Sequence, residues 1–242
     1  MRSALLLGVL AIAVGSAPGS AARSVEEPPL GVGASQVWVL RPMGPIRSVV
    51  VFLHGWGTFS PEAMPWIDHL RARGNAVVFP RYQKDVNDRT TSTIYRLRDG
   101  LRRAFAQRGL RNRPVVTVGV SWGASLAFQY GAQARVWQVP APSAVVALNP
   151  ASQRFGGPPQ RGLPRSVRVL LMVGDADRPF SAQTFWHWLG HHPRGRKTFR
   201  IVRSTATFRA DHASPTRSTP AARRAFWVPV DRLIARARAP GR

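Results

Sequence analysis

Short apolar runs, most of them continuous and rich in valine, recur along this chain and constrain its fold more than any other feature. Strands buried on both faces have continuous runs of this kind, whereas strands with one solvated face alternate between apolar and polar residues. The runs occupy residues 37–40, 49–53, 76–79, 115–120, 144–148 and 167–173. The pattern therefore predicts a mostly parallel central sheet with helices on both faces.

Amphipathic stretches between these runs predict the covering helices. They occupy residues 61–73, 91–108, 122–135 and 183–189, and a further helix begins at Thr219-Pro220. Pro229 should kink or split this last helix, because proline has no N–H for the helical hydrogen bond. The alternation of strands and helices is typical of βαβ units and predicts an α/β fold class.

The 242 residues suffice for one domain, which we expect over residues 36–242. Arg2, the apolar stretch 4–14 and the small residues Ser20, Ala21 and Ala22 resemble a Sec-type signal peptide over residues 1–22. The stretch is too short to span a bilayer. We therefore expect a secreted protein, extracellular or associated with the cell envelope. The alternative is an uncleaved segment that anchors the protein to a membrane. Residues 23–35 then form a linker.

Basic residues outnumber acidic residues by 35 to 11, for a formal net charge of +24. Such a balance raises nucleic acid, acidic polymers and anionic membrane surfaces as partners. The arginines are scattered, and no basic stretch is interleaved with aromatic residues, which disfavours nucleic acid. A genome that favours arginine codons explains the charge equally well. Attachment to an acidic envelope remains an expectation. The absence of cysteine excludes a disulfide scaffold and a thiolate site.

The segment Gly119-Val120-Ser121-Trp122-Gly123 is the strongest chemical signal. It matches the pattern G-x-S-x-G, ends a predicted strand and leads directly into a predicted helix. In this context the turn is so tight that the serine hydroxyl is lifted above the carboxyl edge of the sheet. The helix N-terminus behind it stabilises developing negative charge. The alternative is a glycine-flanked serine in an ordinary turn. We expect Ser121 to be a nucleophile.

A serine hydroxyl needs a base to become nucleophilic at neutral pH. His212 is suited to this role, because it follows the apparent strand 198–203 and precedes the last helix. The remaining histidines are worse placed. His54 belongs to a turn after a strand, where it braces the loop; the others are His69, His187, His191 and His192, in helical stretches or at a helix end.

The imidazole in turn needs a carboxylate that holds its tautomer. Asp175 and Asp177 both follow the predicted strand 167–173. Asp177 lies further out on the loop and is favoured, although the neighbouring Arg178 competes for it. Asp175 is the alternative, and its other role would be to accept backbone N–H bonds within the turn.

Acyl transfer also needs donors for the oxyanion. The N–H of Trp122, at the start of its helix, is one candidate. The loop His54-Gly55-Trp56-Gly57 follows an earlier strand, and its glycines allow the N–H of Trp56 to face the site. An ordinary glycine turn is the alternative. Aromatic residues expected near the mouth suggest an apolar substrate pocket: Trp56, Phe59, Tyr82 and Phe180, with Trp122 and Trp186 equally compatible with the core.

These segments together resemble the α/β-hydrolase superfamily, and the order Ser121, Asp177, His212 is the order of that family. The resemblance extends from about residue 36 to 234. It implies the α/β-hydrolase fold, Ser121 as nucleophile, Asp177 as acid, His212 as base and backbone donors at Trp56 and Trp122. The looser likeness is to small secreted esterases and dienelactone-hydrolase-like enzymes. Residues 149–166 are too few and too rich in glycine and proline for a large cap domain.

The resemblance implies a serine hydrolase that cleaves carboxylic esters, with a small-molecule or lipid-like substrate and neither cofactor nor metal. Two alternatives stay open. One is an acyltransferase of the same fold, and the other is a non-catalytic binder of acidic polymers. The fold determines machinery rather than substrate, so the identity of the ester is not predicted.

Overall fold

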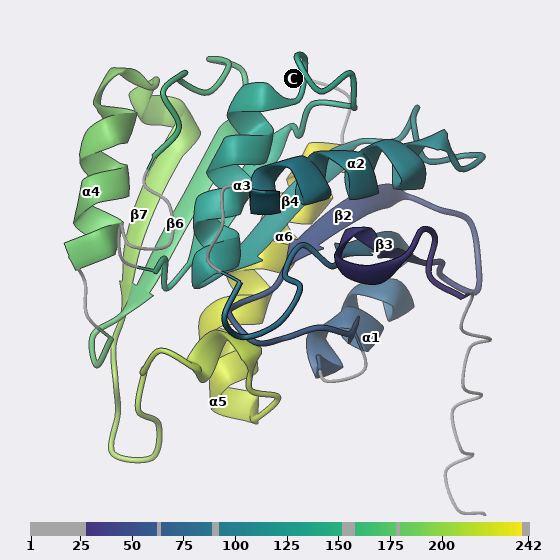
Figure 1. Ribbon diagram of the computed structural model, residues 1–242. Coiled ribbons are helices and arrows are strands. Elements are labelled where there is room, and N and C mark those ends of the chain that lie inside the picture. The colour runs from purple at the N-terminus through teal and green to yellow at the C-terminus, as the bar shows by residue number, and fades with distance from the viewer. Residues whose placement is uncertain (1–27, 62–63, 89–91, 152–157, 178–179, 239–242) are drawn as a thin grey trace, which may run out of the picture.

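A seven-stranded sheet forms the centre of the computed structural model, which describes residues 28–61, 64–88, 92–151, 158–177 and 180–238, the first two residues of the last range by their backbone only. The strand order is β1-β3-β2-β4-β5-β6-β7. The strands are β1 Val37–Leu40, β2 Ser48–Leu53, β3 Asn75–Pro80, β4 Val115–Val120, β5 Ala144–Leu148, β6 Arg168–Gly174 and β7 Lys197–Val202. Neighbouring strands are parallel except for β1, which runs antiparallel to β3 (Figure 1).

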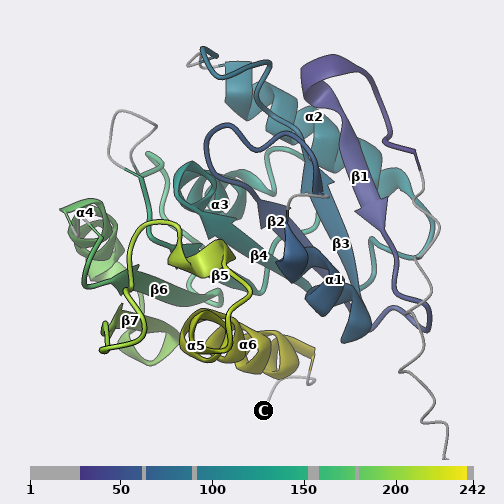
Figure 2. The same cartoon turned by 90° about the horizontal axis from the view of Figure 1, so that it is seen from below.

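Helices cover both faces of the sheet, as predicted (Figure 2). They are α1 Pro65–Ala72, α2 Ser92–Ala106, α3 Trp122–Gln133, α4 Phe180–Trp188, α5 Pro220–Ala222 and α6 Val228–Arg238. Side chains of α2, α3 and α4 pack in one core cluster, and side chains of α1 and α6 pack in the other. The molecule is therefore a three-layer α/β/α domain, and the predicted α/β-hydrolase fold class is confirmed.

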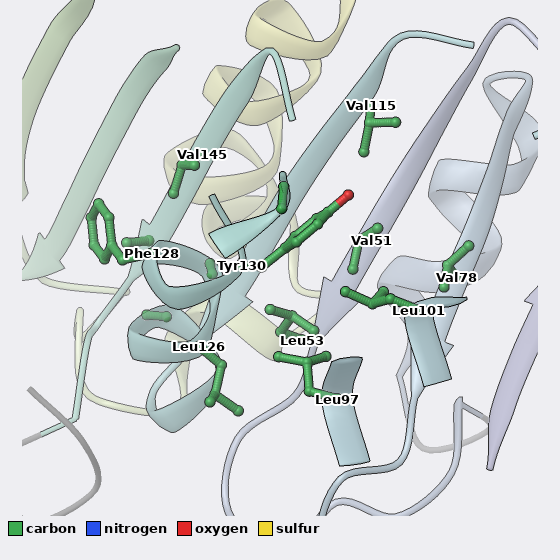
Figure 3. Close-up of a cluster of buried hydrophobic side chains, with 14 of the residues drawn as sticks. Val51, Leu53, Val78, Leu97, Leu101, Val115, Leu126, Phe128, Tyr130 and Val145 are labelled. Carbon is green, nitrogen blue, oxygen red and sulfur yellow. The ribbon is translucent and has the colours of Figure 1, made fainter. Parts of the chain in front are cut away.

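The continuous apolar runs are explained by this sandwich. Within β2, Val49 and Val51 belong to the cluster beneath α2 and α3, whereas Val50 and Phe52 belong to the opposite cluster. Every residue of β2, β3, β4 and β5 is buried. Figure 3 shows the first cluster, in which side chains of α2 and α3 face the sheet; they include Leu97, Leu101, Leu126 and Phe128 from the helices and Val51, Leu53 and Val78 from the strands.

Two prolines set helix boundaries. Helix α1 begins at Pro65 instead of residue 61, because proline is tolerated in the first helical turn, where its missing N–H costs nothing. The C-terminal helix begins as predicted, with the Thr219 side chain accepting from the N–H of Ala222. A π-helical turn, Arg223–Trp227, then separates α5 from α6 just before Pro229, so the helix is split as expected.

Described residues before position 36, in the predicted linker, contact the domain. Leu30 forms a bridge with Val37, and the carbonyl of Ser35 accepts from Arg103 of α2. A glycine-containing 3₁₀ turn, Gly33–Ser35, folds this short segment back onto the domain. The predicted signal peptide and residues 23–27 lie outside the described residues.

The connection after β5 has no helix in its described parts, residues 149–151 and 158–167; residues 152–157 lie outside the description. Among the described helices, none combines the length and apolar composition that a bilayer span requires.

Candidate active site

Ser121 occupies a sharp turn between β4, the central strand of the sheet, and α3. Its backbone has φ 56° and ψ −119°, a conformation that non-glycine residues rarely adopt. The flanking glycines make the turn possible. A Cβ on Gly119 would lie 2.1 Å from the carbonyl oxygen of Gly123, and a Cβ on Gly123 would lie 2.0 Å from that of Leu53. Such backbone strain persists only where the surrounding structure imposes it. The sharp turn places the Ser121 hydroxyl above the edge of the sheet.

His212 and Asp177 lie beside this hydroxyl. The Nε2 atom of His212 is 2.8 Å from Ser121 Oγ, and its Nδ1 atom is 3.1 Å from each carboxylate oxygen of Asp177. The hydrogen bond to Asp177 raises the pKa of His212 above its ordinary value. The His212 side chain is 52% exposed, whereas that of Asp177 is only 9% exposed. The three residues predicted from far apart in the sequence are thus brought into one hydrogen-bonded line.

Asp175 takes the other role that the sequence left open. Its carboxylate accepts from the N–H of Ser204 at 2.9 Å and from the Ser204 hydroxyl at 2.5 Å. These bonds lower the pKa of Asp175. Ser204 Oγ also accepts from the N–H of Ala210, two residues before His212. Asp175 therefore organises the segment that leads to the base, and Asp177 faces the imidazole.

The loops that carry Asp177 and His212 touch at Gly174. A Cβ on this residue would lie 1.9 Å from the carbonyl oxygen of Ala210. The same carbonyl accepts from the N–H of Ala176 at 3.1 Å. Only glycine allows this approach, which sets the separation of Asp177 and His212.

Asn149, directly after β5, is a site residue that the sequence patterns did not indicate. Its side chain is fully buried and its φ is 43°. The Nδ2 atom donates to the carbonyl oxygens of Asp211 and His212 at 2.9 and 3.1 Å, and Oδ1 accepts from the N–H of Gly174 at 2.9 Å. The N–H of Ser121 bonds to the carbonyl of Leu148, the preceding residue. Asn149 thus joins the loops that carry Ser121, Asp177 and His212. The sequence signal that could have indicated this residue is an asparagine directly after a buried strand.

The turn that follows His212 is braced from within. Ser214 Oγ bonds to the Asp211 carboxylate at 2.9 Å, and Arg217 pairs with the same carboxylate at 2.9 Å. Trp227 Nε1 donates to the carbonyl of Pro215, which attaches the turn to the C-terminal helical segment. The position of His212 therefore depends on packing of the last helix.

The loop after β2 passes directly over Ser121. A Cβ on Gly55 would lie 3.4 Å from Ser121 Cβ, so a larger residue here would crowd Ser121. The N–H of Gly57, whose φ is 77°, donates to Gln83 Oε1 at 2.9 Å. The ring of Trp56 lies 5.0 Å from that of Trp122, the first residue of α3. The oxyanion roles of Trp56 and Trp122 stay predictions.

His54 is fully buried beneath that loop. Its Nδ1 atom lies 2.7 Å from the carbonyl oxygen of Gly55, and its ring stacks on Tyr82 at 4.1 Å. Burial lowers the pKa of His54 to about 4, so it is neutral at physiological pH. The expected bracing role agrees with these contacts. The two other histidines with described hydrogen bonds make them elsewhere: His69 with Asp231 and His192 with the carbonyl of Val167.

The aromatic residues expected at the mouth have different surroundings. Tyr82 is 0% exposed and donates to the carbonyl of His54, so its predicted place in the substrate pocket is wrong. It fails because the ring supports the loop from below. Phe59 is partly exposed, with the Arg81 guanidinium 5.3 Å from its ring centre, and Trp56 is also partly exposed. The side chain of Phe180 lies outside the described residues.

The sequence was equally compatible with a pocket or a core position for Trp122 and Trp186, and both pack in or against the core. Trp122 is buried in the cluster of α2 and α3, and Trp186 packs partly buried against it. Lys197 lies 4.9 Å from the Trp186 ring centre. No group of three or more potential metal ligands gathers within the described part of the chain.

A mostly parallel sheet with a strained serine turn and a serine–histidine–aspartate line at its carboxyl edge defines the α/β-hydrolase class. The chain belongs to the alpha/beta hydrolase family, whose model matches residues 50–241. No curated protein matches the chain.

Several solved structures share the fold. Esterase B from Lactobacillus rhamnosis, inhibited by a tributyrin phosphonate, has a TM-score of 0.65 at 15% identity, over 84% of this chain and 81% of that one. Carboxyl esterase 2 from Tuber melanosporum has a TM-score of 0.62 at 14% identity, over 87% and 85%. A soluble variant of the monoglyceride lipase from Saccharomyces cerevisiae has a TM-score of 0.69 at 11% identity, over 93% and 100%.

Proposed function

We propose that this protein is a serine hydrolase that cleaves carboxylic esters through an acyl-enzyme. The observation that carries the proposal is the line of hydrogen bonds from Ser121 through His212 to Asp177. Carboxylesterases and a lipase among proteins of the same fold support the reaction class. The substrate class that fits is a small-molecule or lipid-like ester.

The reaction runs in two steps. His212 Nε2 takes the proton of the Ser121 hydroxyl as Oγ attacks the ester carbonyl, and a tetrahedral intermediate forms. His212 then gives this proton to the leaving alcohol, and the C–O bond breaks. Water then enters, loses a proton to the same nitrogen and attacks the acyl carbon to give a second tetrahedral intermediate. The bond between this carbon and Ser121 Oγ breaks, Oγ takes the proton back from His212 Nε2, and the carboxylic acid leaves. The Asp177 carboxylate accepts from Nδ1–H and stabilises the imidazolium during both steps.

The negative charge of each intermediate rests on backbone donors. The N–H of Trp122 lies at the positive end of α3, and the N–H of Trp56 belongs to the loop that passes Ser121. One such donor typically contributes about 3 kcal/mol to the transition state. Trp56 and Phe59, both partly exposed, would contact the acyl or alcohol part of the ester.

Labelling with a fluorophosphonate tests the proposal. The wild type should be labelled at Ser121, and Ser121→Ala should abolish both labelling and turnover of short-chain p-nitrophenyl esters. Ser125→Ala is a matched control on the same helix, because Ser125 Oγ is buried and makes no described hydrogen bond. Its folding, labelling and turnover should match the wild type.

The outcomes separate the remaining alternatives. A wild type that is never labelled would favour a non-catalytic binder, and hydrolysis retained by Ser121→Ala would refute the assigned nucleophile. The acyltransferase alternative predicts that an added alcohol acceptor captures the acyl group in preference to water. Product analysis with a radiolabelled acceptor distinguishes the two.

Export is a separate proposal that rests on residues 1–22 alone. The charged start, apolar stretch and small residues before position 23 support a cleaved Sec signal and a secreted enzyme. N-terminal sequencing of the mature protein should begin at or near Arg23. A mature protein that begins at Met1 or Arg2 would contradict cleavage.

A further inference from the structure

The two edges of the sheet differ in charge. The loops that enter the strands lie at the amino edge, toward the top of Figure 1, opposite the edge that carries Ser121. We define the amino-edge face by five such loops, residues 41–47, 107–114, 134–143, 161–167 and 189–196. They contain no acidic residue. Their arginines are Arg41, Arg47, Arg108, Arg111, Arg113, Arg135, Arg161, Arg165, Arg194 and Arg196.

The carboxyl edge is balanced by comparison. Five of the eight aspartates in the described residues follow strands there: Asp85, Asp88, Asp175, Asp177 and Asp211. The other three are on helices: Asp68, Asp99 and Asp231. Codon usage alone would raise the number of arginines, but it would not confine the aspartates to the carboxyl edge and the helices.

Arginines of the amino-edge face bond to backbone carbonyls. Arg41 donates to the carbonyl of Arg108 at 3.3 Å, Arg111 to that of Gln138 at 3.1 Å and Arg196 to that of Ser166 at 3.2 Å. A carbonyl oxygen carries no net charge, so the bonds of Arg111 and Arg196 hold their guanidinium groups without neutralising them. The three bonds also tie loop 107–114 to loops 41–47 and 134–143, and loop 189–196 to loop 161–167.

The array is elongated. The loops of the amino-edge face enter β2, β4, β5, β6 and β7, which are consecutive in the sheet. Adjacent strands are about 4.8 Å apart, so the row of loops extends over roughly 20 Å. Guanidinium groups bind carboxylates and phosphates with two parallel hydrogen bonds. A chain molecule with regularly spaced anionic groups is complementary to such a row.

We propose that the amino-edge face is a docking surface for a linear polyanion that carries phosphate groups along its length. A lipid bilayer fits less well, because the exposed large apolar residues within these loops are only Met43 and Val136. Bound in this way, the enzyme would hold its catalytic edge away from the polymer and open to solvent. The binding itself does not depend on the proposed ester hydrolysis.

Two charge-reversal variants test the proposal with fluorescent long-chain polyphosphate as the probe. Arg113→Glu/Arg135→Glu/Arg165→Glu alters exposed arginines of the amino-edge face whose side chains make no described hydrogen bond. Arg200→Glu/Arg203→Glu/Arg224→Glu makes the same net-charge change on exposed arginines outside that face. Circular dichroism confirms that both variants are folded before binding is measured by anisotropy over a series of NaCl concentrations.

We expect the amino-edge variant to weaken binding at least tenfold and to lower the slope of log Kd against log salt by about two to three, because each lost phosphate contact releases fewer counterions. The control variant should change Kd less than threefold. Saturating polyphosphate should leave fluorophosphonate labelling of Ser121 unchanged. If the wild type is not labelled even without polyphosphate, that result contradicts the hydrolase proposal and leaves the docking surface to be judged by the binding measurements.

Three results would overturn the docking surface. Equal weakening by both variants would mean that net charge, and not this face, binds the polymer. Tighter binding to phosphatidylglycerol vesicles than to polyphosphate, lost in the same amino-edge variant, would assign the face to a membrane. Polymer that blocks labelling of a reactive Ser121 would place it at the catalytic edge.

Discussion

The bond between Asp177 and His212 favours the protonated form of His212, the proposed base. The carboxylate raises the pKa of His212, and only the neutral imidazole can accept the Ser121 proton. Activity should therefore rise with pH through the His212 pKa and fall on acidification. At the residue scale, changing this contact is the most direct test of the proposed reaction.

Asp177→Asn should lower the pKa of His212, because it removes the negative charge that favours the imidazolium. The acidic limb of kcat/KM should move to lower pH, while the plateau falls about 10³- to 10⁴-fold, since an amide no longer stabilises the imidazolium or holds its tautomer. A pH–rate profile from pH 4 to 9 measures both effects. A limb that moves to higher pH would contradict the assigned acid.

Asn149 acts at the same scale as a positioning residue, since its three side-chain hydrogen bonds connect the acid and base loops. We expect Asn149→Ala to lower kcat/KM about 100-fold, mainly in kcat, because a shift of about 1 Å in catalytic groups costs that much. The acidic limb of the pH profile should move as well. Steady-state kinetics well below the unfolding temperature measures both effects.

Asn75→Ala is the matched control for that experiment. Asn75 is equally buried and also makes three side-chain hydrogen bonds, with Ser48, Leu70 and Arg238, but it lies at the start of β3, on the amino edge. It should lose stability and keep the kinetics of its folded fraction. An equal loss of kcat/KM in both variants would mean that Asn149 has only a structural role.

At the scale of elements, the site depends on close approaches between strand ends and loops. Glycines permit them at Gly119, Gly123 and Gly174, where a Cβ would meet a backbone carbonyl. The G-x-S-x-G pattern is enough to indicate the first two, because their constraint is local to the serine turn. The constraint on Gly174 comes from Ala210, far along the chain, so no local pattern indicates it.

Gly174→Ala should separate the acid loop from the base loop, because the backbone around Ala210 must shift to relieve the overlap. We expect a loss of about 1–3 kcal/mol in unfolding free energy, as for other overpacked sites, and at least tenfold slower fluorophosphonate labelling. Urea denaturation and a labelling time course measure these effects. Gly190→Ala is the control, because nothing lies within 4 Å of a Cβ at this position, and it should be near wild type in both measurements. Similar losses of stability and labelling rate in the two variants would exclude overlap with the Ala210 carbonyl as the cause.

Element boundaries are less predictable than element order. The strands lie within a residue or so of the predicted runs, since burial on both faces leaves a continuous signal. Helix α1 begins later than predicted, at Pro65, and the segment before β1 packs against α2. These details depend on local caps and contacts between distant segments, which periodicity does not encode.

At the scale of the whole molecule, the net charge of +24 opposes compaction. Raising NaCl from 0.01 to 0.15 M shortens the screening length from about 30 to about 8 Å. We therefore expect the urea midpoint of unfolding to rise over this range. The increase should be smaller in Arg113→Glu/Arg135→Glu/Arg165→Glu, and a midpoint that falls with salt in the wild type would contradict net self-repulsion.

Local patterns of burial and turn chemistry in the sequence are enough to predict the layered α/β architecture, the sharp turn at Ser121 and the order Ser121, Asp177, His212 along the chain. Only the tertiary structure decided that Asp177 and not Asp175 faces His212, that Tyr82 supports a loop from within, and that Asn149 joins the catalytic loops. It also brought the arginine-rich loops that lack acidic residues together at one edge of the sheet. Each of these depends on the approach of residues far apart in the chain, and the free energy of such contacts is set by three-dimensional packing.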